Sequence, residues 1–219
     1  MYNISKNERR ASRDIDFDFI RYDISNDNSI DNFIQVIDRK AEDVSITRTG
    51  DITELHQEDY KGKRAVLKIE DASYSMTIKI DIGVHTLFMA KQAYMLFNLS
   101  SSGKILKVRV NPIEQIIAEK LYSLAKHRAL STRFKDVYDI YYLVNNCDVN
   151  KNDVKMLLMA LIKYGKNDID ELDMLIDRVV NTFNDKMFIG RLASTDYDWV
   201  GICSNEEVLN VIEDFLYSL

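Results

Sequence analysis

The sequence RDIDFDF, residues 13–19, alternates carboxylates with apolar residues. Side chains two residues apart share one face of a β-strand, so the aspartates would line one face and the apolar residues the other. Two carboxylates one pleat apart suit a divalent cation, because Mg²⁺ takes hard oxygen ligands. The same pattern is also typical of a half-buried strand with a solvated acidic face. This stretch alone leaves both interpretations open.

The composition indicates an ordinary globular chain. Its 219 residues are 46% hydrophobic and 29% charged, which is enough for a sizeable core. The net charge of −6 gives no overall basic surface for nucleic acid. Neither a signal-peptide pattern nor a membrane-spanning run occurs, and the two cysteines have no metal-ligand spacing, so we expect a reducing cytoplasm. Glycine-rich cradles for phosphate, GxGxxG and GxxxxGK[ST], are absent from the sequence.

The first half of the chain predicts strands and one helix. We expect the helix over 30–43, capped by Ser29, and a hairpin over 64–84 that turns at Asp71-Ala72-Ser73. The clearest strand is 74–84, where isoleucines alternate with polar residues. The strands are expected at 14–22, 44–49, 52–56, 64–70, 74–84 and 104–110.

The second half predicts helices. Asn111 is expected to cap the first of them, with Pro112 in its first turn. Asp153, Asp168 and Ser204 are expected to begin later helices. The chain therefore predicts an α+β fold with a mixed or antiparallel sheet in domain 1–110, followed by a helical bundle in domain 111–219. The helices are expected at 113–128, 133–146, 150–164, 168–185 and 204–218.

A second acidic position lies in Lys79-Ile80-Asp81-Ile82-Gly83. If this strand pairs beside residues 14–22, Asp81 joins Asp14 and Asp16 on one face. Three strand-borne carboxylates are what a two-metal phosphoryl-transfer centre needs. A solvated Lys-x-Asp face is the alternative.

A third group lies where two helices are expected to meet. Lys120 lies beside the apolar stripe of the first helix, and Arg128 and Arg133 flank the loop that follows. These cations suit a nucleotide triphosphate, and Asp136 is placed to hold Lys120. The alternative is a helix hairpin joined by ordinary surface pairs such as Lys135–Asp139.

Taken together, these segments resemble the AbiEii/AbiGii-type toxin family, nucleotidyltransferase-like proteins of the DNA polymerase β superfamily. The resemblance covers about residues 10–145. The four matching segments occur in the family's order, and the set is more specific than any one of them. They are Arg10-x-Ser12-x-Asp14-Ile15-Asp16-Phe17, Lys79-Ile80-Asp81-Ile82-Gly83, Glu119-Lys120-Leu121-Tyr122-Ser123-Leu124 and Arg133-Phe134-Lys135-Asp136-Val137-Tyr138-Asp139-Ile140.

The resemblance implies a sheet of nucleotidyltransferase type and transfer of NMP from an NTP to an acceptor such as tRNA or a protein. It implies Mg²⁺ (or Mn²⁺) on Asp14, Asp16 and Asp81, with Asp81 as the base for the attacking hydroxyl. Asp136 would support the site. The implied setting is a toxin–antitoxin or phage-defence pair with a cognate antitoxin. The residues expected to bind the nucleotide are Ser12, Lys79, Lys120, Arg128 and Arg133.

Family members carry a Gly-Gly or Gly-Ser turn before the first aspartate pair, and that turn contacts phosphate. Met1–Ser12 contains no glycine, so we expect the usual first strand and turn to be missing. The chain is then truncated relative to the family, and its activity is in question. The exposed sheet edge that results would suit a homodimer or a partner chain. A catalytically inactive homologue that acts as a protein-binding module is the alternative function.

Overall fold

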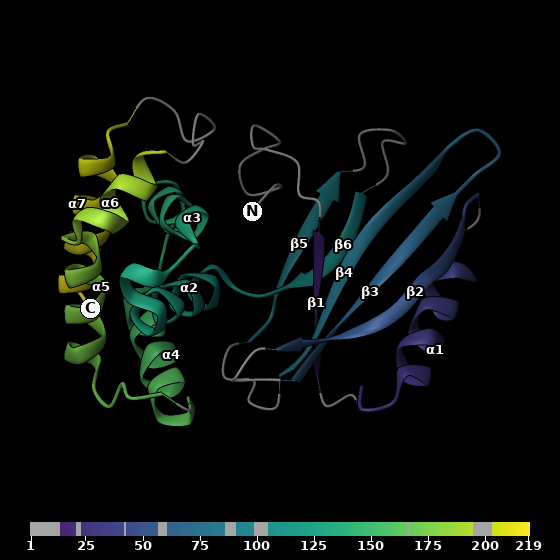
Figure 1. Ribbon diagram of the computed structural model, residues 1–219, viewed down its shortest axis with the longest axis horizontal. Coiled ribbons are helices and arrows are strands. Elements are labelled where there is room, and N and C mark those ends of the chain that lie inside the picture. The colour runs from purple at the N-terminus through teal and green to yellow at the C-terminus, as the bar shows by residue number, and fades with distance from the viewer. Residues whose placement is uncertain are drawn as a thin grey trace. The chain divides into compact units, whose positions relative to one another are not determined.

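The computed structural model describes residues 14–20, 23–41, 43–56, 61–85, 91–98, 105–165, 167–194 and 203–219 (Figure 1). These residues form two compact units, one within Ala11–Phe88 and the other within Met89–Leu219. Each unit has its own hydrophobic core. The division expected at residue 110 stays a prediction. No helix in the described ranges has the length and apolar character needed to cross a bilayer.

The first unit is a four-stranded mixed sheet with one helix. Its order is β1-β4-β3-β2, in which β1 runs parallel to β4 and the other neighbours are antiparallel. The predicted mixed sheet is therefore confirmed, as is the hairpin that turns at Asp71. The elements are β1 (Asp14–Ile20), α1 (Asp27–Asp38), β2 (Ser45–His56), β3 (Lys61–Glu70) and β4 (Ser75–His85).

Helix α1 covers one face of this sheet. Phe33 of α1 meets the rings of Phe17 and Phe19 of β1, with centroids 5.4 and 4.8 Å apart. Because side chains alternate along β1, Asp16 and Asp18 lie on the opposite face, which no helix in the described part of this unit covers and which we call the open face. The buried apolar residues under α1 are Ile24, Ile30, Ile34, Ala65, Leu67, Ile80 and Ile82.

The expected bounds of α1 are wrong at both ends. Its N-cap is Asn26, not Ser29, because the Asn26 side chain accepts a hydrogen bond from the backbone of Asn28 at 2.9 Å. The helix ends at Asp38, whose carboxylate accepts from the backbone N–H of Ile46 at 2.6 Å. This side chain thereby ties the end of the helix to the start of β2.

The two strands expected at 44–49 and 52–56 form one strand, β2. Its pairing with β3 shifts register between Thr49 and Thr53, where Gly50 has a φ of 74°. A glycine can adopt this left-handed conformation without strain and so forms a bulge within a continuous strand. The expected gap between the two strands is therefore the position of this register shift.

The second unit begins with an antiparallel hairpin of β5 (Ala93–Asn98) and β6 (Ile105–Val110). Strand β6 was predicted, but β5 was not, because its sequence AYMLFN lacks the alternation of polar and apolar residues that marks a half-buried strand. The remaining elements are α2 (Ile113–His127), the 3₁₀ turn η1 (Arg128–Leu130), α3 (Phe134–Asn146), α4 (Lys151–Tyr164), α5 (Leu172–Phe183), α6 (Lys186–Ala193) and α7 (Asn205–Tyr217).

The helical bundle is confirmed, with corrections at the helix starts. Pro112 rather than Asn111 precedes α2, Asn150 rather than Asp153 caps α4, and α5 begins after Glu171 rather than at Asp168. Ser204 caps α7 as predicted. The helix expected over 168–185 is α5, which ends at Phe183, and the helix that follows it, α6, was not predicted; the Asp185 side chain caps α6.

Gly165, at the C-terminus of α4, is a position where the packing requires glycine. A Cβ there would lie 1.6 Å from Oη of Tyr122 and 2.7 Å from the carbonyl of Leu161. Tyr122 is buried, and its hydroxyl accepts from Asn167 at 2.6 Å. We predict that Gly165→Ala lowers the free energy of unfolding by roughly 1–3 kcal/mol through overpacking, measured by urea denaturation followed by circular dichroism.

Gly190 is the matched control for this prediction. It lies within α6, and a Cβ there would meet nothing within 4 Å. Gly190→Ala should raise the stability by about 0.5–1 kcal/mol, because alanine is the better helix former. Equal stability of the two variants would contradict the close packing described for Gly165.

Candidate functional site

The first candidate site lies on the open face of the mixed sheet. In the parallel pair, Asp16 of β1 lies opposite Asp81 of β4, and Asp14 lies opposite Lys79. Neighbouring strands are about 4.8 Å apart, so paired side chains on one face are neighbours. The condition on which Asp81 could join the first acidic strand is therefore met. The side chains of Ser12 and Asp14 lie outside the described part of the chain.

Arg64 of β3 lies opposite Asp81, on the other side of β4 from Asp16, so three neighbouring strands contribute a charged residue here. Its Nε and Nη2 donate to Oδ1 and Oδ2 of Asp81, each at 2.6 Å, which is a bidentate ion pair. Sequence reasoning missed Arg64, although a signal was present. The turn at Asp71 sets the register of the hairpin, and counting back evenly along both strands places Arg64 opposite Asp81.

Carboxylates are suitable ligands for a hard divalent cation, and here two of them are paired in register on one face. Among the side chains that the structure describes, no group of three or more His, Cys, Asp or Glu is arranged to hold a metal. The predicted third ligand, Asp14, is outside that set, so the metal site stays a prediction.

The second candidate site joins α2 to α3. The Lys120 ammonium donates to Oδ1 of Asp136 and, at 2.9 Å, to Oδ2 of Asp139. Arg133 donates from Nε to the other oxygen of Asp136 at 2.6 Å. The side chain of Lys120 is 16% exposed and those of both aspartates 8%. The interpretation of these aspartates as members of ordinary surface pairs is therefore wrong.

The charge on Lys120 is stabilised by its two partners. Burial alone would lower the pKa of its ammonium, but the carboxylates of Asp139 and Asp136 outweigh burial and raise the pKa above its usual value. Lys120 is therefore charged at neutral pH. Its charge and that of Arg133 balance the two carboxylates. Asp139 was not expected to take part, although its spacing of three residues from Asp136 was visible.

We predict that Lys120→Met destabilises the second unit by roughly 3–5 kcal/mol. The substitution leaves Asp136 and Asp139 buried without the ammonium that both contact, and removing one partner of a buried ionic network is strongly destabilising. Thermal and urea denaturation measure the change.

Lys163→Met is the matched control, since Lys163 is an exposed residue of another helix, α4. It should change the stability by about 0.5 kcal/mol or less. Adding Asp139→Asn to Lys120→Met should restore part of the loss, because one buried charge is then removed. If Lys120→Met is no more harmful than Lys163→Met, the network does not stabilise the unit.

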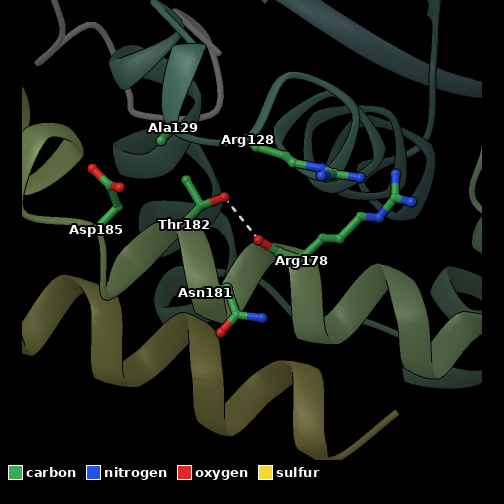
Figure 2. A pocket seen from close by; sticks show the side chains of 6 residues that line it. All are labelled: Arg128, Ala129, Arg178, Asn181, Thr182 and Asp185. Carbon is green, nitrogen blue, oxygen red and sulfur yellow. Dashed lines mark hydrogen bonds between the residues drawn. The ribbon is translucent and has the colours of Figure 1, made fainter.

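Arg128 is not part of the Lys120 network as described. It follows α2 with a φ of 50° and a ψ of −143°, a sparsely populated backbone conformation that costs roughly 1–3 kcal/mol for a residue with a side chain. It lines a cavity of about 290 Å³ beside α5 (Figure 2). The residues expected to bind nucleotide are thus not all in one place: Lys120 and Arg133 belong to the ionic network between α2 and α3, whereas Arg128 lines this cavity. The cavity is lined by Arg128, Ala129, Arg178, Asn181, Thr182 and Asp185.

Comparison with solved structures identifies the class of fold. A crystal structure of a proposed nucleotidyltransferase from H. pylori matches 99% of this chain and 81% of its own, with a TM-score of 0.53 and 16% sequence identity. At this identity the likeness shows only that the two chains share a fold. JHP933 from Helicobacter pylori covers 99% and 79% of the two chains at 16% identity, but its TM-score of 0.46 is too low to carry an argument.

The family is shown by sequence. The profile of the family described as "Nucleotidyl transferase AbiEii toxin, Type IV TA system" matches residues 2–200, and the chain belongs to this family. Membership confirms the resemblance drawn from the four segments. It also supports a nucleotidyltransferase of a toxin–antitoxin system, with an NTP as substrate and an antitoxin as partner. No protein of curated function matches the chain.

Proposed function

We propose that this chain is a metal-dependent nucleotidyltransferase that transfers NMP from an NTP to an acceptor such as tRNA. The observation that carries the proposal is the in-register pair of Asp16 and Asp81 on the open face of the sheet. The proposed setting is a toxin–antitoxin or phage-defence pair in the cytoplasm, with a cognate antitoxin.

Asp14, Asp16 and Asp81 would hold the Mg²⁺ or Mn²⁺. When bound, the metal would supply charge for the attacking and leaving oxygens of the displacement. Asp81 is the proposed base for the hydroxyl of the acceptor. Arg64 fixes the orientation of Asp81 through two hydrogen bonds and is a positioning residue in this scheme.

The proposed phosphate contacts are cationic. Lys79 is exposed and lies two residues before Asp81 on β4, on the same face of the sheet as the Asp16–Asp81 pair. In the helical unit, Arg133 is more suitable than Lys120, because its side chain is 54% exposed whereas the Lys120 ammonium is held between two buried carboxylates. Ser12 remains a proposed contact from the family pattern alone. Arg128 belongs to the cavity beside α5.

A second candidate function is an inactive homologue that acts as a protein-binding module. The observation that favours it is the Arg64–Asp81 ion pair, which engages both oxygens of an expected metal ligand. The two candidates differ in whether the open face binds a divalent cation.

The transfer reaction tests the main proposal. Incubation with Mg²⁺, each labelled NTP and total tRNA should transfer label to RNA, and the double variant Asp14→Ala, Asp16→Ala should lose at least about a hundredfold of that rate, since metal-held charge contributes several kcal/mol. Asp18→Ala, on the same face of β1, is the control and should retain activity. A chain that labels neither RNA nor protein contradicts the proposal.

Metal binding tests the role of Arg64. We predict that Arg64→Gln strengthens Mn²⁺ binding on the order of tenfold, because the guanidinium no longer competes for Asp81, and tenfold corresponds to about 1.4 kcal/mol. Electron paramagnetic resonance of free Mn²⁺ measures the affinity. Lys68→Gln removes a cation from the same face of β3, where Lys68 pairs with Glu70, and should have little effect. Absence of Mn²⁺ binding in all variants would favour the binding module.

A further inference from the structure

We propose that the cavity beside α5 binds a phosphate ester through Arg128 and Arg178, and that the phosphate takes the place of the Asp168 carboxylate. Figure 2 shows the guanidinium groups of Arg128 and Arg178 extending toward one another from two different elements. The source of the phosphate is the NTP or the acceptor RNA, so the inference rests on the proposed function. Arg178 lies outside the four segments that carry the family resemblance.

The two arginines already share one anionic group. Arg178 donates from Nη1 to Oδ1 of Asp168 at 2.8 Å, and from Nη2 to the backbone carbonyl of Asp168 at 2.8 Å. Arg128 donates from Nη2 to Oδ2 of the same carboxylate at 3.4 Å. Two guanidinium groups that reach one carboxylate can also reach one phosphate, which offers more oxygens and more charge.

The carboxylate is the removable member of this group. The side chain of Asp168 is 77% exposed, whereas that of Arg178 is only 13% exposed. The hydrogen bond from Arg178 is the main cause that lowers the pKa of Asp168, so the carboxylate stays ionised at neutral pH. Because its carboxylate is open to solvent, Asp168 can exchange its contacts with Arg178 for water or for another anion. An incoming phosphate can therefore replace Asp168 at small cost while Arg178 stays in place.

Asp185 is the acid among the residues that line the cavity, and its carboxylate contacts the start of α6 rather than the arginines. Asp185 accepts hydrogen bonds from the backbone N–H groups of Met187 at 2.8 Å and Phe188 at 3.0 Å, where it caps α6. Its charge is thus used at a helix N-terminus, which favours anions. With Asp168 displaced, the two guanidinium groups outnumber the Asp185 carboxylate among the charged side chains that line the cavity.

The neighbouring sequence is basic although the chain as a whole is acidic. Residues 120–135 contain no Asp or Glu and carry five cations, of which Lys120 and Arg133 are paired with Asp136 and Asp139, in a chain with a net charge of −6. Arg128 lies within this segment, and Arg178 adds a cation from α5. The cavity volume of about 290 Å³ is at the lower end of ligand sites, a size suited to one phosphate and its sugar.

Two substitutions with opposite expected effects test the proposal in the full chain. Binding of inorganic phosphate, ATP and total tRNA is measured by calorimetry or filter retention. Arg178→Gln should weaken binding about tenfold, because hydrogen bonds to charged groups are the strong ones. Asp168→Asn should strengthen it several-fold, because the competing carboxylate is removed. Denaturation curves show that each variant is folded.

The control substitutions remove charges of the same sign at neighbouring residues. Arg191→Gln removes an exposed cation of α6, and Asp170→Asn removes an exposed acid two residues from Asp168. Both should change binding by less than about twofold. If Arg178→Gln has no effect, or if Asp168→Asn equals Asp170→Asn, the cavity is not a phosphate site and the proposal is overturned.

The three probes distinguish the source of the phosphate. An effect on ATP alone assigns the cavity to the nucleotide, and an effect on tRNA alone assigns it to the acceptor. For tRNA, Arg178→Gln should also reduce the slope of log affinity against log salt by about one. If wild-type protein transfers no nucleotide but the opposite effects of the two substitutions remain, the proposed function fails and the phosphate site stands.

Discussion

The candidate metal site depends on how the first strand packs against α1. Phe17 and Phe19 pack their rings against Phe33. Because side chains alternate along a strand, the aspartates of β1 must then lie on the other face of the sheet. A slip of one residue would exchange the two faces and place carboxylates in the core. The parallel register with β4 then places Asp81 beside Asp16. The core of this unit thus fixes which acids are paired on the open face.

In both candidate sites a basic side chain forms ion pairs with the aspartates and fixes their position. On the sheet, Arg64 fixes Asp81, and between α2 and α3 Lys120 joins two buried aspartates. Buried ionic networks seldom stabilise more than apolar residues of the same volume would, but breaking them is expensive. The buried network between α2 and α3 and the partly exposed Arg64–Asp81 pair both hold charged groups in fixed positions, as a site for phosphate or metal would require.

The general architecture followed from the sequence, because it depends on periodicity and on a few turn residues. The structure contains the strand predicted from the alternation in 74–84, the hairpin turn before it and the helices predicted from the long helical patterns. Helix caps were less predictable, since several polar residues near each start can compete for the same backbone N–H groups. Strand β5 and helix α6 were not predicted, because segments of 6 and 8 residues give little periodic signal. The role of Arg178 could not be predicted from the sequence for a different reason, because only the tertiary fold brings α5 beside Arg128.

The Arg64–Asp81 ion pair need not exclude a metal. A carboxylate has about four lone-pair positions, and a bidentate guanidinium uses one on each oxygen. The remaining positions can still bind a cation, although the positive charge of Arg64 lowers the gain. Arg64 would then hold Asp81 in one orientation while weakening its attraction for the metal. The same two hydrogen bonds that favour an inactive module are therefore also those expected of a positioning residue, and the difference between the two functions lies in how strongly the open face attracts a divalent cation.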